Sequence, residues 1–284
     1  MVMMPLLAIT LNSCVGEKMI DIEKEKEKKN EKTKLVKTMS YYFEEFKGKE
    51  TCIVVYTYIY DDKKNLIRID KKNLIGNEFM DNVNTFTYEN SRIRQDFIYE
   101  GKPESRKIYT LDNNDYVTRI DNYDGLINRG WHTILEYSNG YLVKATYNRS
   151  DNDSPSSNTC VWENGNLIKI NHAEGYTTTF TYGNVENKLN VNLPCYSDLD
   201  TDWISETGMF FQFFYSRNNL SYILGLSPTL KLKGVMTSKN LPIKITYPAY
   251  GETQIVNFSY TFDSDGYPTE IRANYEDKYI ITYY

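Results

Sequence analysis

The chain has few of the residues on which metal sites and nucleophilic catalysis depend. It contains two histidines, His132 and His172, and four cysteines, and no Cys-x-x-Cys pair occurs. Zinc requires closely spaced Cys, His or carboxylate ligands, which this pattern does not supply. A catalytic cysteine requires a histidine partner, and only two histidines are available. We therefore expect no metal and no cofactor.

Common catalytic motifs are also missing. The sequence has no Gly-x-Ser-x-Gly elbow, no phosphate-binding glycine loop and no His-Glu-x-x-His. Asp198–Asp202 begins like a calcium loop, but Trp203 stands at the position of its glycine and Met209 at that of its final glutamate. This segment is better interpreted as a turn or a helix cap. The 38 acidic residues leave one enzymatic alternative open: a glycoside hydrolase with a carboxylate pair on a concave face.

Positive charge and long apolar runs are scarce as well. The formal net charge is −5 and the sequence pI is about 5.3, which argues against nucleic acid as a partner because phosphate contacts need a basic surface. Met3–Leu11 is apolar but too short for a helix that crosses a bilayer.

What the chain has in abundance is tyrosine, 26 residues, arranged in a repeat. Each copy is an alternating strand that ends at an aromatic or leucine, then a turn of Asn, Asp or Gly, then a phrase such as Leu167–Ile170. The steps between copies run from 20 to 28 residues, enough for two strands and two turns. The residues that precede the turns are Tyr60, Tyr88, Leu111, Tyr137, Trp162, Tyr182 and Phe262.

The strands and turns of the repeat point to β-hairpins. In Thr179–Tyr182 and Phe258–Phe262 aromatic residues alternate with Thr or Ser, so one face of each strand is aromatic and the other polar. Asn139-Gly140 and Asn164-Gly165 suit type I′ turns, which need two positive φ angles. Asp263–Gly266 suits a longer turn with a left-handed residue. Successive hairpins of this kind predict an all-β fold: a single large, curled antiparallel meander, a half-open, barrel-like sheet.

The repeated phrase resembles known families. Tyr58–Ile69 and Tyr260–Ile271 are loosely similar to the YD-type repeats of the RHS family. Residues 51–284, including Ser238–Ile245 and Asp265–Pro268, more closely resemble a group of Bacteroidetes lipoproteins of unknown function with a porin-like β-meander domain. The resemblance implies a curled β-meander and brings no known activity and no catalytic residues.

The N-terminal region indicates export and anchoring. Leu11–Cys14 resembles a bacterial lipobox, although Asn12 departs from the usual choice at its position. We therefore expect residues 1–14 to be a lipoprotein signal segment and Cys14 to carry the lipid, which implies the outer membrane or cell surface of a Gram-negative bacterium. Residues 15–37 are dense in Lys and Glu and predict a solvated tether. Residues 38–284 then form the repeat-built β domain.

The repeat breaks at about 191–234, where Met209–Tyr215 is strongly apolar. We expect a short helical insert at about 197–227 that fills the concave side of the sheet. Cys52 and Cys160 lie on expected strands as small buried residues, and Cys195 lies in the insert; their spacing does not decide whether two of these cysteines pair.

The function that follows is a membrane-tethered, exported lipoprotein of non-enzymatic binding or surface-scaffold type, with a glycan or a peptide as the ligand. A Tyr- and Trp-rich concave face suits stacking against a ligand, and Trp131, Trp162 and Trp203 are the candidate ligand-binding residues, with packing as the alternative role of each. A transmembrane barrel fits less well, because the non-aromatic strand face carries Thr, Lys, Asn and Asp, whereas lipid requires an apolar band.

Overall fold

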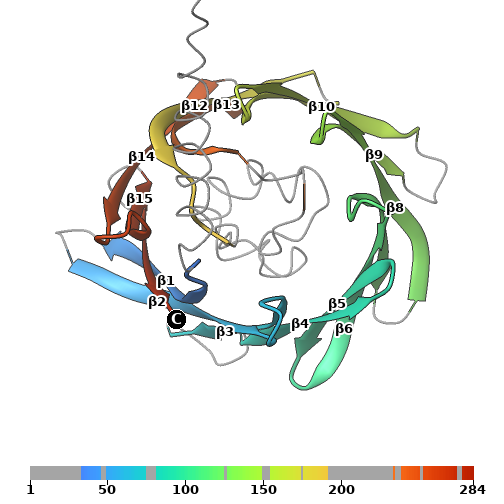
Figure 1. The fold of residues 1–284 in the computed structure, drawn as a ribbon, viewed down its shortest axis with the longest axis horizontal. Coiled ribbons are helices and arrows are strands. Elements are labelled where there is room, and N and C mark those ends of the chain that lie inside the picture. Colours follow the sequence, from blue (N-terminus) through green and yellow to red (C-terminus); the bar gives the residue numbers. More distant parts are fainter. Residues whose placement is uncertain are drawn as a thin grey trace, which may run out of the picture. The chain divides into compact units, whose positions relative to one another are not determined.

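The compact unit Leu35–Tyr284 folds as a closed antiparallel β-barrel. The computed structural model describes residues 33–45, 49–74, 81–124, 127–148, 154–173, 175–190, 233, 238–249, 252–273 and 277–284. Over these residues sixteen strands follow one another around the ring in chain order (Figure 1). The strands are β1 Val36–Glu45, β2 Lys49–Tyr60, β3 Leu66–Asn73, β4 Asn82–Glu89, β5 Arg92–Tyr99, β6 Lys102–Leu111, β7 Val117–Asp124, β8 Ile127–Ser138, β9 Tyr141–Asn148, β10 Ser156–Glu163, β11 Asn166–Asn171, β12 Thr177–Glu186, β13 Asn240–Ala249, β14 Glu252–Phe262, β15 Pro268–Ala273 and β16 Asp277–Tyr283.

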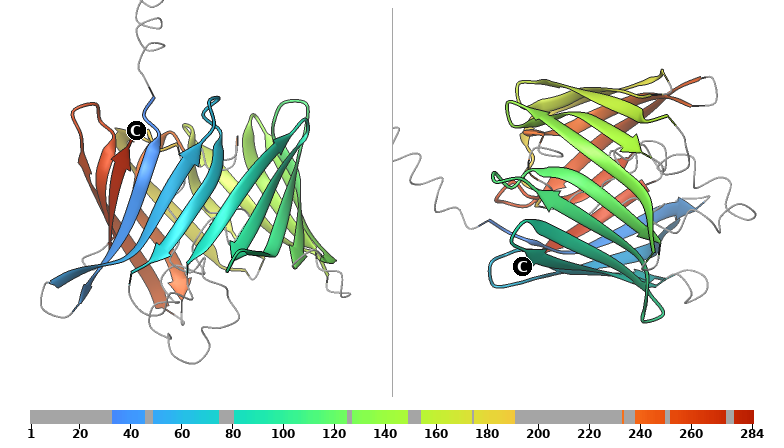
Figure 2. Two further views of the ribbon diagram at one scale, coloured as in Figure 1. Left: turned by 90° about the horizontal axis from the view of Figure 1, so that it is seen from below. Right: turned by 90° about the vertical axis from the view of Figure 1, so that its right-hand side faces the viewer.

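The prediction of an all-β antiparallel meander is confirmed, and the prediction of a half-open sheet is wrong. β1 pairs with β16, with Met39 opposite Ile281 and Tyr41 opposite Tyr279, so the first and last strands close the ring. Closure depends on pairing between strands more than 200 residues apart. The local alternation of apolar and polar residues does not reveal this pairing, so the sequence did not predict closure. The strands are inclined to the barrel axis, as a closed sheet requires (Figure 2).

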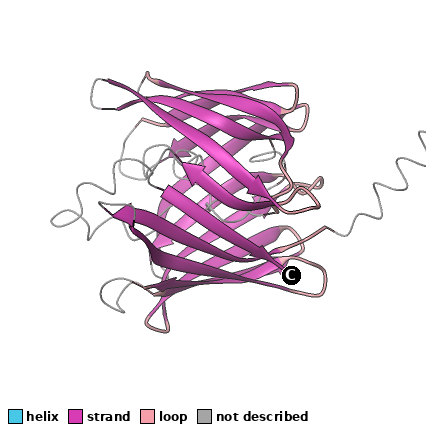
Figure 3. Ribbon diagram, turned by 90° about the vertical axis from the view of Figure 1, so that its left-hand side faces the viewer, coloured by secondary structure: helices cyan, strands magenta, loops and turns pink. Residues whose placement is uncertain are grey.

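Helix is absent from the described part of the chain, which is strand, turn and loop (Figure 3). The helical insert predicted at about 197–227 lies wholly outside the described residues. Among the residues that are described, no helix has the length and apolarity needed to cross a membrane.

The apolar side chains of the wall point into the barrel. In β14, Val256 is 9% exposed and its neighbour Ile255 is 50% exposed, and the same alternation runs through the other strands. Nothing described lies outside the ring of strands in Figures 1 and 2, so the buried set faces inward. Its members include Tyr58, Tyr109 and Ile170, each fully buried. The outward set is mainly Thr, Ser, Asn and charged residues.

A β-bulge after most of the tight turns explains the recurring Leu-x-x-Ile spacing, whereas the β4–β5 turn has no register shift. Trp162 pairs with Leu167 and Val161 with Lys169, so Ile168 is the extra residue. Without a bulge, residues three apart in a strand would face opposite sides. The bulge turns both Leu167 and Ile170 inward, and they are 2% and 0% exposed. The same register shift occurs after the turns that follow Tyr60, Leu111, Tyr137 and Phe262.

Candidate functional site

One end of the barrel, which we call the rim, collects the distinctive residues of the repeat. It carries the tight turns β2–β3, β4–β5, β6–β7, β8–β9, β10–β11 and β14–β15, the start of β1 and the end of β16. The connection from β12 to β13 also leaves and returns at this end. All the aromatic residues that precede turns therefore lie around one opening of the barrel.

Four of the residues that precede turns, Tyr88, Tyr137, Trp162 and Tyr182, continue the hydrogen bonding between neighbouring hairpins. The β9–β10 pairing ends at Lys144, two residues short of Leu142. The Trp162 indole N–H donates to the Leu142 carbonyl at 2.7 Å and so satisfies an acceptor that the ladder does not reach. Hydroxyl groups do the same at 2.7 to 3.0 Å elsewhere on the rim: Tyr88 to Leu66, Tyr137 to Val117, Tyr182 to Leu167 and Tyr283 to Pro268.

The exception in the repeat has a matching explanation. Leu111 stands where the other copies have an aromatic residue, and leucine has no side-chain donor. Here the β5–β6 ladder runs to the turn, with Arg92 opposite Thr110, and the Leu111 backbone N–H donates to the Ser91 carbonyl at 2.8 Å. No carbonyl is left for a side chain to satisfy, so leucine suffices.

Tyrosines that follow turns link consecutive hairpins in a second way. Tyr141 stacks on Trp162 of the next hairpin, with ring centroids 4.7 Å apart, and its hydroxyl lies over Gly165. Tyr116 does the same one hairpin earlier, with Tyr137 and Gly140. A Cβ on Gly140 would lie 3.1 Å from the Tyr116 hydroxyl oxygen, and its φ of +81° is left-handed. Both the turn geometry and the neighbouring ring therefore require glycine.

The longer turns are closed by an aspartate. The Asp61 carboxylate accepts the backbone N–H groups of Lys63 and Asn65 at 2.9 and 2.8 Å. Asp112 and Asp263 repeat this arrangement in their own turns. The pKa of Asp61 is lowered by the hydrogen bond from the Asn65 side chain and then by these backbone donors. Each carboxylate is thus occupied by its own turn.

Burial makes the rim tyrosines weak acids. It raises the pKa of Tyr60, Tyr88 and Tyr182 to about 12, because a phenolate would lose solvation there. The pKa values of Tyr137, Tyr260 and Tyr283 are raised for the same reason. These hydroxyls remain donors at neutral pH.

Residues Asn187–Asn190, which follow β12, fasten the chain to distant points of the rim. The Lys188 ammonium donates to the Asp265 carbonyl at 2.8 Å, and Leu189 is buried in the core. The Asn190 amide donates to the Tyr60 hydroxyl, and its carbonyl oxygen accepts the Val36 N–H, both at 2.9 Å. In Figure 1 this yellow segment runs from β12 into the area enclosed by the ring.

The structure separates the candidate ligand-binding tryptophans. Trp162 is half-buried at the rim, held by Leu142 and Tyr141. Trp131 is half-buried beside Gly130, toward the opposite end of β8. Trp203 and the lipid-attachment candidate Cys14 lie outside the described residues, as do Asp198–Asp202 and Cys195. The two described tryptophans therefore lie toward opposite ends of the barrel wall.

The described cysteines are free thiols. Cys160 faces inward at 7% exposure, as expected, and burial raises its pKa to about 12. Cys52 is half-buried on the outer face beside Tyr42, and burial raises its pKa too. Both shifts keep the thiols protonated, which disfavours a nucleophilic role.

The outer wall is fastened by ion pairs that the sequence analysis did not identify. Arg94 and Arg106 both contact the buried carboxylate of Asp96, Arg68 contacts Asp70, and Arg119 contacts Asp121. The signal in the sequence is Arg-x-Asp, because residues two apart lie on the same strand face.

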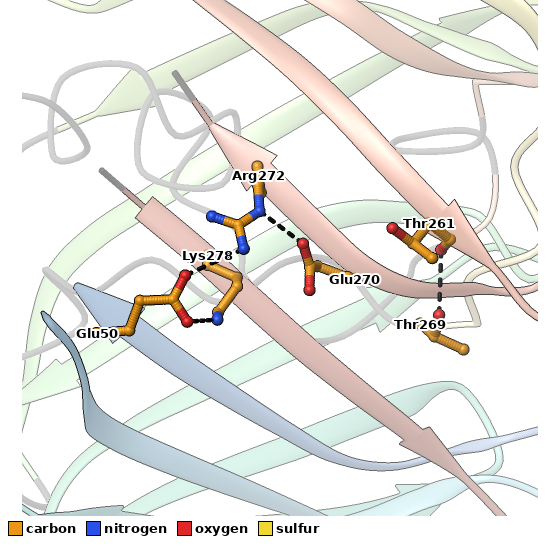
Figure 4. A network of polar contacts seen from close by, with 6 residues as sticks. All are labelled: Glu50, Thr261, Thr269, Glu270, Arg272 and Lys278. Carbon is orange, nitrogen blue, oxygen red and sulfur yellow. Dashed lines mark hydrogen bonds and ion pairs between the residues drawn. The ribbon is translucent and has the colours of Figure 1, made fainter. Parts of the chain in front are cut away.

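A second polar network crosses the seam where the barrel closes (Figure 4). Glu50 of β2 contacts Lys278 of β16 and, at 3.0 Å, Arg272 of β15. Arg272 also contacts Glu270 at 2.6 Å, and the Lys278 ammonium lies 4.9 Å from the centre of the Tyr42 ring. The side chains stand on the face of the wall turned away from the strands across the barrel. Charged groups thus occupy the outer face at the seam as well.

Several of the described carboxylates have roles other than that of a glycosidase pair. Asp70, Asp96, Asp121 and Glu270 lie on the outer face within ion pairs, and the turn aspartates bond their own backbone. The inward polar groups instead include an amide network, in which Tyr109 donates to Gln95 and Gln95 to Asn84, both at 2.7 Å.

We expect Trp162→Phe to cost about 1–3 kcal/mol in the free energy of unfolding, because it keeps a ring beside Tyr141 but leaves the Leu142 carbonyl without its donor. Urea unfolding would measure the loss. Tyr88→Phe removes a similar donor at a more exposed position, with Tyr88 38% exposed, and should cost less. Equal stability of Trp162→Phe and the parent chain would contradict this role.

The fold has a solved counterpart. A crystal structure of a porin-like protein from Bacteroides uniformis matches this chain with a TM-score of 0.59 at 15% sequence identity. The match covers 88% of this chain and 98% of that one. At this identity the similarity establishes the fold alone. No family model and no curated protein matches the sequence.

Proposed function

We propose that this chain is an exported, lipid-anchored, non-enzymatic protein of binding or scaffold type, whose barrel stands in water at the outer membrane or cell surface. One observation carries the proposal: the wall is polar and ion-paired outside and mainly apolar inside. Asp96, with Arg94 and Arg106 on either side, lies in the middle of the outer wall. A barrel in lipid needs the reverse arrangement, with an outward apolar band.

The energy of transfer favours the aqueous location over the lipid-embedded one. An Arg or Lys on the lipid face costs about 2–4 kcal/mol at the bilayer midplane. The outer wall carries Arg68, Arg94, Arg106, Arg119 and Arg272 on strands in the described residues alone. Several such costs together exceed the stability of an ordinary domain. The porin-like neighbour supports a shared barrel shape, and the outward side chains favour an aqueous setting for this one.

The anchor remains a proposal based on the sequence. Cys14 with its lipobox-like context, followed by the charged residues 15–34, suits a lipid-modified N-terminus and a tether. Twenty residues reach at most about 70 Å when extended, so the tether would hold the barrel clear of the lipid headgroups. The ligand, a glycan or a peptide, and the contributions of Trp131, Trp162 and Trp203 are part of the same proposal.

We expect the chain to partition with membranes through Cys14 alone. The parent chain, expressed in a Gram-negative host, should incorporate a palmitate analogue and sediment with membranes. Cys14→Ser should lose the label and appear in the soluble fraction as a folded protein without detergent. Cys52→Ser serves as the matched control and should behave like the parent.

Two outcomes would overturn the proposal. A Cys14→Ser chain that stays in the membrane after carbonate washing would show that the barrel itself is embedded in lipid. Turnover of a glycan by the purified soluble chain would show an enzyme.

A further inference from the structure

The arginines of the outer wall gather on one side of the barrel. Five arginines lie on β3, β5, β6 and β7, which are neighbours or next neighbours in Figure 1. We call them the arginine patch: Arg68, Arg92, Arg94, Arg106 and Arg119. Among the described residues, the register places no arginine on the outer face of β10–β14, where Thr159, Thr179 and Thr246 lie.

Two guanidinium groups of the patch are held through Nε alone, whereas Arg94 and Arg119 also use a terminal nitrogen, on Thr87 and Asp121. Arg68 uses its Nε to contact Asp70 at 2.6 Å, and Arg106 uses its Nε to contact Asp96 at 2.5 Å. Within the described part of the chain, the hydrogen bonds and ion pairs of Arg68 and Arg106 are made through Nε. A carboxylate on the Nε edge fixes the plane of the group, and the terminal nitrogens form the planar fork that binds carboxylate, sulfate or phosphate.

The patch is positive although the protein is acidic. On the outer faces of β3–β7 the register places six cations and four carboxylates, a surplus of two positive charges, while the whole chain carries −5. The six cations are Arg68, Lys72, Arg92, Arg94, Arg106 and Arg119, and the four carboxylates are Asp70, Glu89, Asp96 and Asp121. An anionic partner is therefore attracted to this side and repelled by the chain as a whole.

The spacing suits an extended partner with repeated charges. Arg68, Thr85, Asp96 and Arg106 lie in one cross-strand row. Three inter-strand steps of about 4.8 Å put the two arginines roughly 14 Å apart along the wall. Thr85 lies between them, and its hydroxyl is of the kind that bonds to sugar hydroxyl groups.

We propose that the arginine patch binds an anionic polysaccharide, one that carries carboxylate or sulfate groups along a hydroxyl-rich chain. Nucleic acid is the alternative anionic partner, and the net charge of −5 opposes its backbone phosphates. The inference extends the proposed function by naming a ligand class and a surface for it. It requires only that the outer wall faces water.

The test measures binding of the full-length chain with Cys14→Ser, which cannot be acylated, to immobilised heparin and to polygalacturonate. The triple variant Arg68→Gln, Arg106→Gln and Arg119→Gln should raise the Kd at least about ten-fold, because three charge-assisted contacts are lost. The triple variant with Lys at the same positions keeps the charge and the wall but loses the fork, and should bind polygalacturonate more weakly than the parent.

The matched control removes three outward cations from another side: Lys144→Gln, Lys169→Gln and Lys244→Gln, on β9, β11 and β13. It changes the net charge equally and should bind like the parent. If both glutamine triples weakened binding equally, the effect would be one of overall charge, and the inference about the arginine patch would be wrong. A parent chain that binds neither polymer would also contradict the inference. Tighter binding of single-stranded DNA or of anionic vesicles than of heparin would overturn the polysaccharide. A parent chain that is soluble but binds neither heparin nor polygalacturonate would leave the proposed function intact.

Discussion

Raising the pH from about 9 to about 12 is expected to unfold this barrel cooperatively, with tyrosine ionisation and loss of β-structure in the same step. An unperturbed tyrosine has a pKa of about 10, whereas burial raises the pKa of Tyr60, Tyr88 and Tyr182 to about 12. Between these values the folded chain binds more protons than the unfolded chain. The free energy of unfolding is therefore at its full value below about pH 10 and falls as the pH rises above it.

Ionisation also removes the hydrogen bonds of the rim, because a phenolate cannot donate. Circular dichroism and absorbance at 295 nm during an alkaline titration would follow the two events. Replacing Tyr60, Tyr88 and Tyr182 with Phe should move the midpoint to higher pH, although the variant is less stable at pH 7. Tyr123→Phe, on the outer wall, is the control and should leave the midpoint unchanged. Ionisation of all tyrosines near pH 10 without unfolding would contradict the prediction.

Inserting one alanine between Lys169 and Ile170 is expected to unfold the protein, whereas deleting Ile168 is expected to be tolerated. The insertion reverses the facing of the strand after Lys169, so the fully buried Ile170 would turn outward and a polar residue inward. Losing the burial of Ile170 costs about 2–3 kcal/mol, and burying an unpaired polar group adds a similar amount. Together these approach the stability of a typical domain.

Deleting Ile168 should instead keep the buried residues of the strand facing inward. Ile168 is the extra residue of the bulge, and its removal leaves Leu167 and Ile170 two apart, on one face. A loss of about 1–2 kcal/mol, from the altered twist at the turn, is expected. Urea unfolding of the two variants, side by side, measures the difference. A deletion that is more harmful than the insertion would show that the bulge does not set the facing of this hairpin.

Local chemistry made the hairpins predictable. Asn139-Gly140 and Asn164-Gly165 have the positive φ angles expected of type I′ turns, +51° and +81° in the first pair and +51° and +80° in the second. In the longer turn the left-handed residue is Gly266, with φ of +77°. Alternation of aromatic and polar residues identified the buried face, because a strand side chain points to the core or away from it.

Contacts between hairpins were less accessible from the sequence. For Tyr88, Tyr137, Trp162 and Tyr182 the partner is a carbonyl on the preceding hairpin, and this pairing appears only when the ladders are seen to stop two residues early. Closure was missed because β1 and β16 carry no signal of their own partner. The arginines were overlooked for another reason: each Arg-x-Asp looks like ordinary surface charge until the register places Arg68 and Arg106 in one row.

The candidate site was likewise only partly predictable from the sequence. Trp162 was singled out as a flat ring for a ligand, and the structure gives that ring a donor role to Leu142 and a partner in Tyr141. The post-turn tyrosines Tyr116 and Tyr141 were not singled out, although their positions directly after turns repeat in the sequence. Their partners lie on the next hairpin, so only the three-dimensional order of the hairpins reveals them.

The pairing of β1 with β16 has a consequence for biogenesis. Until its last seven-residue strand is available, the chain has two unsatisfied edges, which attract other strands. Synthesis must therefore deliver the complete polypeptide before the ring can form, and a product that ends before Asp277 would keep both edges open to proteases and to other strands. The order of the strands thus couples completion of the chain to closure of the barrel, because the last strand, β16, pairs with the first, β1.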